Sequence, residues 1–268
     1  MFSFWKQEDR IGGRTWTAKT LGEEIEMGGT WVHWSQPHVY TELHRHEMAG
    51  TIERARMYKL ENGGRNCLSD ITFNPPLSPI RQTAVVQGHI NKGAKIHLKL
   101  REKLPGWTWT SSGYRTSECF FAFSDHSRTH PSGPSGTWCI GFGYNGKLAD
   151  KTDSQHIIWQ FKESLYSNVT IEAYATHDWM NDPYAKGAWA CWGPNSASKF
   201  LEKSQRRHGR IVFASADWAD GWRGFVDGAI KQGQVAVREV LKLLKEQGVA
   251  QSRLYSLFSE NWLQLTVG

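Results

Sequence analysis

The sequence predicts an α/β fold, and two observations support that prediction. Near the C-terminus, the apolar run 210–214 (RIVFA) is typical of a buried strand. It leads through a glycine-containing turn into 224–246, where apolar residues recur at helical spacing and Gly248 offers a stop. Earlier in the chain, apolar and polar residues alternate over 95–100 and 137–142, as they do in strands. A buried strand, a tight turn and a helix make one half of an α/β nucleotide-binding unit.

Weaker patterns predict the remaining elements. The run 22–34 (GEEIEMGGTWVHW) indicates a strand that enters a turn, and 74–90 indicates a proline-rich turn followed by a short helix or loop. Loop-forming residues dominate 105–136, which we expect at the surface. Residues 154–167 favour a helix and 169–175 a strand.

The composition is that of a globular protein, with 39% hydrophobic and 22% charged residues. Fourteen tryptophans are unusual, and they indicate either an aromatic-walled ligand pocket or an excess of core aromatics. The formal charge of +6 is scattered along the chain, which favours a solvated surface over nucleic acid as a partner. The same charge suits an anionic cofactor such as a dinucleotide.

The chain has four cysteines: Cys67, Cys119, Cys139 and Cys191. They stand far apart without a CxxC pair, which argues against a structural zinc site and a disulfide scaffold and favours a reducing compartment. Four histidines are candidate metal ligands by residue type: His44, His46, His126 and His130. Their spacing fits no standard ligand pattern, so we expect no metal.

The sequence contains no recognised targeting or membrane segment. The first ten residues lack the apolar core of a signal peptide, and no stretch approaches the roughly 18 apolar residues that cross a bilayer. The final residues, LQLTVG, are not a peroxisomal address. We therefore expect a cytoplasmic protein with no membrane partner.

Short motifs follow one another along most of the chain. They lie at 8–15 (EDRIGGRT), 28–31 (GGTW), 73–77 (FNPPL), 91–95 (NKGAK), 187–189 (GAW), 213–217 (FASAD) and 222–229 (WRGFVDGA). In order and content they resemble the flavin-containing, FAD-dependent monoamine oxidases, and fungal members in particular. The family carries DRxGGR, a glycine-rich segment, FxPPL with a lysine, and an FAGTE…WxGYxEGA block in the same order. The resemblance implies common ancestry and a small-molecule amine as substrate.

The resemblance also implies which residues bind FAD. They are Gly12, Gly13, Arg14, Gly28, Gly29, Thr30, Trp31, Asp217, Trp222 and Val226. The 12–14 segment would approach the pyrophosphate, and 28–31 would run beside the flavin ring. Asp217 would bind a ribityl hydroxyl, with a helix or turn cap as the alternative. Val226, at the positive end of a helix, would donate an N–H to the pyrimidine edge.

Three residues would face the reaction: Lys95, Trp189 and Phe225. Lys95 would hold a water near flavin N5, and a solvent-facing lysine is the alternative. Trp189 and Phe225 would form an aromatic cage, more apolar than the two tyrosines usual in the family, although both could be core residues. Some members carry a cysteine bonded to the flavin where this chain has Ala188, so FAD should be non-covalent.

The sequence departs from the family in three places. Nothing before Glu8 resembles a strand, GxGxxG and a helix, and Lys6 occupies the position of the acidic residue that binds the adenosine ribose. Few residues between Met48 and Cys67 replace a long part of the substrate domain. These departures predict a truncated member, with an incomplete FAD/NAD(P)-binding Rossmann-like domain and an α+β substrate domain.

The predicted division of the chain has four parts. They are 1–50, the N-terminal part of the FAD-binding domain; 51–180, a shortened substrate domain; 181–248, the C-terminal part that closes over the flavin; and 249–268, a tail. The oligomeric state stays open.

Three functions remain open from the sequence. The chain could oxidise an amine to an imine and then an aldehyde, with reduction of oxygen to hydrogen peroxide and, for a fungal enzyme, a role in secondary metabolism. It could be an inactive homologue that serves as an accessory protein or partial gene product. It could also be an aromatic-rich binding module unrelated to flavin, although that reading leaves the ordered motifs unexplained.

Overall fold

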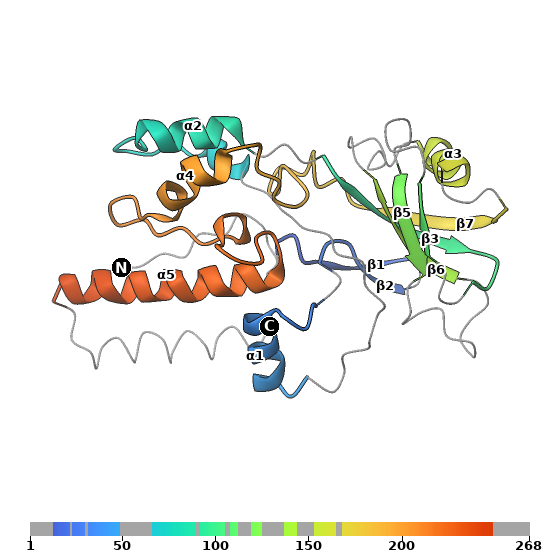
Figure 1. Ribbon diagram of the computed structural model, residues 1–268, viewed down its shortest axis with the longest axis horizontal. Coiled ribbons are helices and arrows are strands. Elements are labelled where there is room, and N and C mark those ends of the chain that lie inside the picture. The colour runs from blue at the N-terminus through green and yellow to red at the C-terminus, as the bar shows by residue number, and fades with distance from the viewer. Residues whose placement is uncertain are drawn as a thin grey trace.

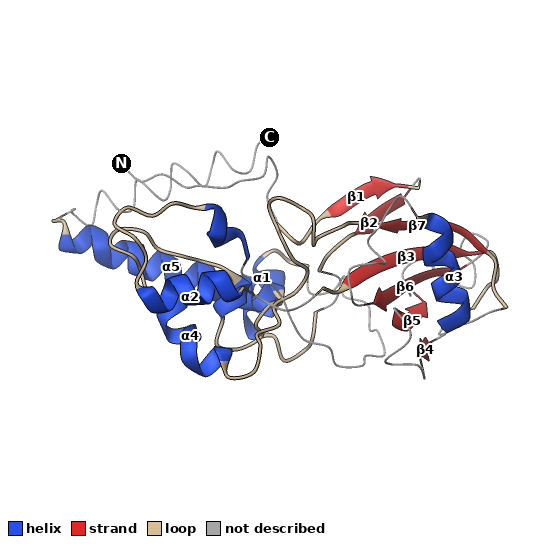
Figure 2. Ribbon diagram, turned by 90° about the horizontal axis from the view of Figure 1, so that it is seen from above, coloured by secondary structure: helices blue, strands red, loops and turns tan. Residues whose placement is uncertain are grey.

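The computed structural model describes residues 13–21, 23–29, 32–48, 66–88, 92–104, 108–111, 119–124, 137–143, 153–164 and 168–248. Within these ranges the chain forms a five-stranded sheet, a two-stranded hairpin and a group of helices. The sheet lies at one end of the molecule, and most of the helices lie at the other (Figures 1 and 2). Three predicted cofactor ligands, Gly12, Thr30 and Trp31, lie outside the described residues.

The five strands follow the order β4-β5-β6-β3-β7, and each neighbouring pair is antiparallel. Their bounds are Ala94–Leu100 (β3), Thr108–Thr110 (β4), Cys119–Ser124 (β5), Thr137–Gly143 (β6) and Ile171–Thr176 (β7). The strands predicted at 95–100, 137–142 and 169–175 are confirmed. The region 105–136, predicted to be rich in loops, also contains β4 and β5, because aromatic residues of high strand propensity interrupt the glycines and prolines there.

Strand β3 is buried on both faces of the sheet. On one face, Ile96 and Leu98 share a core with Ile157 and Phe161 of helix α3 (Ser154–Ser164), which confirms the predicted helix. Figure 2 shows α3 packed across the strands on this side. The face is apolar throughout, so the opposite face of β3 carries the polar side chains.

The hairpin β1 (Thr17–Thr20) and β2 (Glu23–Glu26) covers that opposite face. Ile25 and Met27 are buried there in one cluster with Trp138 of β6. The strand predicted within 22–34 is therefore confirmed. The position of the hairpin places the backbone of Glu26–Gly28 over the face of β3 that carries the polar side chains.

The long C-terminal helix α5 runs over Val226–Glu246, and Gly248 follows with φ of +72°. Its predicted extent and stop are confirmed. Helix α1 (Pro37–Arg45) packs against it, where Asp227 accepts a hydrogen bond from Val39 N–H at 2.9 Å. None of the helices in the described ranges is long and apolar enough to cross a membrane.

Two shorter helices lie side by side beyond α5 (Figure 1). They are α2 (Pro79–Gln87) and α4 (Ser196–Gln205), and the Gln87 amide donates to the Ser196 hydroxyl at 2.7 Å. Within the predicted segment 74–90, the helix therefore extends over Pro79–Gln87. Neither α1 nor α4 has a sequence pattern strong enough to predict it.

The buried strand predicted at 210–214 is wrong. Only an isolated bridge joins His208 and Ile211, and Ile211 is 47% exposed. No strand in the described part of the chain lies beside this run to pair with it. Phe213 instead packs against the guanidinium of Arg81, which lies 4.5 Å from the centre of its ring.

Candidate functional site

Arg14 joins two segments that lie far away in the sequence. Its guanidinium donates to the Asp217 carboxylate at 2.5 Å and to the Ala188 carbonyl at 2.6 Å. Asp217 is 4% exposed and belongs to the short 3₁₀ helix η4 (Ala216–Trp218). The structure thus brings together three of the motifs, with the two predicted cofactor ligands Arg14 and Asp217 paired to each other.

The turn-cap alternative for Asp217 is not what the structure contains. Ser215 is the cap of η4, because its hydroxyl accepts the Asp217 N–H. The Trp192 indole donates to the Asp217 carbonyl at 3.0 Å, which holds the same residue from the other side. The Asp217 side chain is therefore directed by its neighbours toward Arg14.

The two glycine segments lie in direct contact. A Cβ added to Gly28 would stand 1.7 Å from the Arg14 carbonyl oxygen, so no side chain fits at that position. A Cβ on Gly29 would meet Thr15 Oγ1 at 3.1 Å and Val226 Cγ2 at 3.4 Å. Backbone from the 13–15 turn, the 28–29 segment and the start of α5 therefore converges at one place.

Lys95 points toward this convergence from β3. Its ammonium donates to the Glu26 carbonyl at 2.5 Å and to the Gly28 carbonyl at 3.0 Å. The residue is 3% exposed, which excludes the solvent-facing alternative. His97 lies two positions along the same face and also contacts the Glu26 carbonyl, at 2.9 Å. Sequence reasoning did not single out His97, although its alternation with Lys95 was visible.

Helix α5 begins at Val226, and no side chain caps it. Among the described residues, no group accepts the Val226 N–H. This donor carries part of the positive charge of the helix start. Trp222 precedes it with φ of +47°, and the Trp222 carbonyl would stand 2.4 Å from a Cβ on Gly228. The glycine therefore lets the loop fold back closely onto the first turn of α5.

The predicted cage residues belong to two separate aromatic groups. Trp189 packs edge-on against Phe142 of β6 at 5.7 Å, and Phe142 stacks on Phe121 of β5 at 4.8 Å. Phe225 packs edge-on against Trp222 at 5.2 Å. No ring contact joins Trp189 to Phe225 in the described part of the chain.

Strand register explains the first aromatic group. Lys95 pairs with Phe142 across β3 and β6, and Phe142 pairs with Phe121 across β6 and β5. Paired residues share a face of the sheet, so the lysine and the two phenylalanines form one row. We call Phe121, Phe142 and Trp189 the aromatic row. Of these three residues, Phe121 belongs to the run 119–124 (CFFAFS), which is visible in the sequence as a cluster of aromatic residues.

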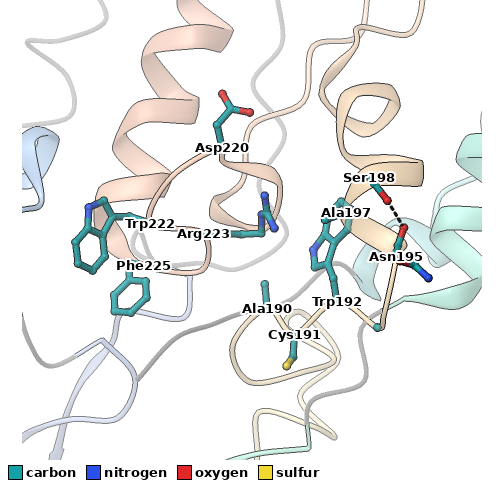
Figure 3. Close-up of a pocket in the computed structure, with 11 residues that line it drawn as sticks. Ala190, Cys191, Trp192, Asn195, Ala197, Ser198, Asp220, Trp222, Arg223 and Phe225 are labelled. Carbon is teal, nitrogen blue, oxygen red and sulfur yellow. Dashed lines mark hydrogen bonds between the residues drawn. The ribbon is translucent and has the colours of Figure 1, made fainter. Parts of the chain in front are cut away.

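A cavity of about 680 Å³ lies between the segment after Trp189 and the loop before α5 (Figure 3). Trp222, Phe225, Arg223 and Trp192 line it, and the Arg223 guanidinium lies 5.1 Å from the Trp192 ring centre. Cys191 also lines this cavity and is partly exposed. The cavity is partly open to the surface.

The described residues contain no group of three or more histidine, cysteine, aspartate or glutamate side chains that could hold a metal ion. His126 and His130 lie outside the described residues. Cys139 is buried in the sheet core, and burial raises the pKa of its thiol far above the ordinary value. The residues gathered at the site are those expected to bind an anionic organic group.

Residues 7–67 and 59–241 match the family model described as flavin containing amine oxidoreductase. The chain belongs to that family. Curated relatives of this chain include pseudooxynicotine dehydrogenase of a Pseudomonas species, 33% identical over 182 residues, which cover 67% of this chain and 35% of the relative. Nicotine dehydrogenase of Pseudomonas putida is 28% identical over 185 residues, covering 67% and 36%.

Solved structures support the same assignment at the level of the fold. Putrescine oxidase bound to putrescine superposes with a TM-score of 0.53 at 18% identity, over 66% of this chain and 41% of that chain. This likeness confirms the predicted fold class of the chain. The chain spans about 35% of the length of the curated relative with which it shares 33% identity.

Proposed function

We propose that the chain acts as an FAD-dependent amine oxidase on a small-molecule amine. The observation that supports this most strongly is the convergence of Arg14, Asp217, Gly28 and Val226, with Lys95 turned toward the same backbone. These residues come from separate motifs, and they meet only in the folded chain. Family membership supports a flavin as the cofactor.

The residues present fit such a cofactor. Arg14 offers guanidinium donors to a pyrophosphate, Asp217 offers an acceptor to a hydroxyl, and Val226 offers a backbone N–H at a helix start. The close approach at Gly28 keeps the neighbouring backbone free of side chains. Ala188 cannot form a thioether, so we propose non-covalent binding.

FAD held by Arg14, Asp217 and Val226 would supply the oxidising chemistry, in which the amine loses a hydride from the carbon next to its nitrogen and oxygen is reduced to hydrogen peroxide. The resulting imine hydrolyses to an aldehyde. Lys95, held by two backbone carbonyls, keeps a positive charge beside the 28–29 segment. The aromatic row next to Lys95 would exclude water and orient the amine.

The same row suggests the kind of amine. Phe121, Phe142 and Trp189 offer ring faces and edges but no carboxylate to a second ammonium group. Three relatives are named for pseudooxynicotine, nicotine and 6-hydroxynicotine. We therefore propose an amine with a flat, apolar ring, in preference to an open-chain diamine. We further propose that the chain is of the fungal type and that it divides into the four parts 1–50, 51–180, 181–248 and 249–268.

The test is the visible absorption spectrum of the purified chain before and after addition of FAD and removal of the excess. Flavin bands that acid releases, followed by amine-dependent peroxide formation, would support the proposal. The Arg14→Gln variant should retain less FAD, and Lys203→Gln on the exposed side of α4 provides a matched removal of one positive charge. A colourless protein that retains no added FAD would overturn it.

A further inference from the structure

We infer that His97 is a positioning residue for Lys95: as a neutral imidazole donating from Nε2, it fixes the Glu26 carbonyl against which the Lys95 ammonium lies. Lys95 and His97 approach this one oxygen at 2.5 and 2.9 Å. Both side chains are almost completely buried. The inference rests on the proposed function in one respect only, which is that Lys95 serves the flavin site.

The tautomer follows from the partner. A backbone carbonyl oxygen accepts hydrogen bonds and donates none, so the ring nitrogen that contacts Glu26 O must carry a hydrogen. His97 is therefore either the neutral Nε2–H form or the imidazolium. Only the neutral form leaves Nδ1 as an acceptor.

The charge follows from the neighbour. Lys95 Nζ and His97 Nε2 lie within hydrogen-bonding distance of one oxygen, and like charges repel strongly when they are close together and away from water. An unperturbed lysine loses its proton near pH 10.4, but an unperturbed histidine loses it near pH 6.5. The inference therefore assigns the charge to Lys95, whose ammonium has two carbonyl acceptors, and the neutral form to His97.

The surrounding charges do not reverse this assignment. Within the described residues, the titratable or charged groups on the strands around His97 and directly after β7 are Lys19, Glu23, Glu24, Glu26, Lys95, Lys99, Cys139, Glu172, Tyr174 and His177. Cys139 and Tyr174 belong to the core on the opposite face of the sheet. The Glu26 carboxylate is turned to the hairpin, where it accepts the Trp16 and Gly28 N–H groups. Glu172 pairs with Lys99 and Arg101 at the far end of the strand. Strand β6 opposite contributes only apolar side chains on this face.

The arrangement constrains Lys95 through the backbone. His97 donates to the Glu26 carbonyl, and the Glu26 carboxylate accepts the Gly28 N–H. Lys95 then bridges this fixed carbonyl and that of Gly28. Loss of the imidazole would leave the carbonyl with the lysine alone, and the ammonium would gain freedom to move from its present place.

The first test needs no cofactor. Two-bond ¹H–¹⁵N spectra of the whole chain report the tautomer and pKa of each imidazole, with His97 assigned by its absence from the His97→Gln variant. We expect the Nε2–H tautomer at pH 7. Lys95→Met removes the neighbouring positive charge, so the fraction of His97 present as imidazolium at a given pH should rise.

Lys99→Met is the matched control, because it removes a charge at the same spacing from His97 but toward the surface, where Lys99 pairs with Glu172. It should change the imidazolium fraction of His97 much less than Lys95→Met does. A wild-type imidazolium at pH 7, an Nδ1–H tautomer, or equal shifts in the two lysine variants would each overturn the inference. The wild-type spectrum decides the tautomer even where Lys95→Met does not fold.

The second test uses the chain loaded with FAD. Gln can still donate an N–H toward Glu26, but Leu cannot, so His97→Leu should lower kcat about tenfold with little change in KM, and His97→Gln should restore most of it. Equal losses in both variants would overturn the positioning role. If the chain takes up no FAD, the proposed function is wrong, but the inference about His97 is not tested by that result. The imidazole spectra, which need no cofactor, then test the inference.

Discussion

The guanidinium of Arg14 lies 2.5 Å from the carboxylate of Asp217, although 203 positions separate the two residues. Asp217 is buried, and the side chain of Arg14 is 26% exposed. The same guanidinium holds the Ala188 carbonyl, next to Trp189. The Arg14 side chain therefore fixes the relative positions of the turn at 13–14, the segment that carries Trp189 and the 3₁₀ helix η4.

Removal of this cation should destabilise the fold. Arg14→Gln leaves the Asp217 carboxylate buried without its partner, which we expect to lower the free energy of unfolding by roughly 2–4 kcal/mol. Urea unfolding of Arg14→Gln, Asp217→Asn and the double variant measures the effect. Because both single changes break the same pair, the double variant should lose less than the two added together. Strict additivity would contradict the pairing.

Gly28 should tolerate no side chain. Gly28→Ala would place its Cβ 1.7 Å from the Arg14 carbonyl, so the backbone must move, and we expect a loss of at least about 3 kcal/mol. Gly233→Ala is the control, because nothing lies within 4 Å of that position inside α5. It should stabilise the chain by roughly 0.5–1 kcal/mol through the higher helix propensity of alanine. Thermal unfolding of both variants provides the comparison.

Local pattern predicted the parts of the fold that local physics determines. The apolar period and the final glycine marked α5, and alternation marked β3 and β6. Helix α1 has only Val39 buried, and it depends on a hydrogen bond to Asp227, 188 positions away. No pattern within 37–45 encodes that contact. The prediction of a strand at 210–214 was wrong because an apolar run forms a buried strand only where another strand lies beside it to pair with it.

The candidate site divides in the same way. The resemblance singled out Arg14, Asp217 and Lys95, and the structure brings their segments together. It did not predict that Arg14 and Asp217 pair with each other, because that depends on tertiary packing. Alternation alone places His97 on the face of Lys95, but the contact of His97 with Glu26 and the position of Phe142 opposite Lys95 depend on how β3 packs against its neighbours.

Asp220 should contribute stability that is lost in acid. The side-chain hydrogen bond from Gln205 chiefly, and then Lys231, lowers the pKa of Asp220 below its ordinary value. A lowered pKa in the folded chain means that this stability is present above the unfolded pKa and lost as pH falls through the folded one. Gln205→Leu should therefore lower the melting temperature at pH 6 but much less at pH 2.5. Calorimetry at the two pH values checks this, and an equal loss at both would contradict it.

The two cysteines whose side chains are described should differ in reactivity. The Cys139 thiol is buried and has a strongly raised pKa, but Cys191 lines the open cavity. Because the thiolate is the reactive form, a thiol reagent at pH 8 should label Cys191 at least about tenfold faster. Mass spectrometry of digested samples measures each site. Labelling of Cys139 at the rate of Cys191 would contradict the buried position of β6.

Phe142 should determine which amines are oxidised, if the proposed function holds. It stands opposite Lys95 in the sheet and between Phe121 and Trp189. Phe142→Leu removes the ring but keeps an apolar side chain, so we expect kcat/KM to fall about tenfold for a ring-bearing amine and to change little for an open-chain one. Peroxide formation with a matched pair of amines measures the ratio.

Phe161 supplies the control for this prediction. It lies on the other side of the sheet, in the core between α3 and β3, and takes no part in the aromatic row. Phe161→Leu should lower stability without changing the ratio of kcat/KM for the two amines, because it alters packing far from the row. A ratio that shifts equally in both variants would mean that Phe142 acts through stability alone. A ratio that shifts only in Phe142→Leu would establish the aromatic row as the surface that selects the substrate.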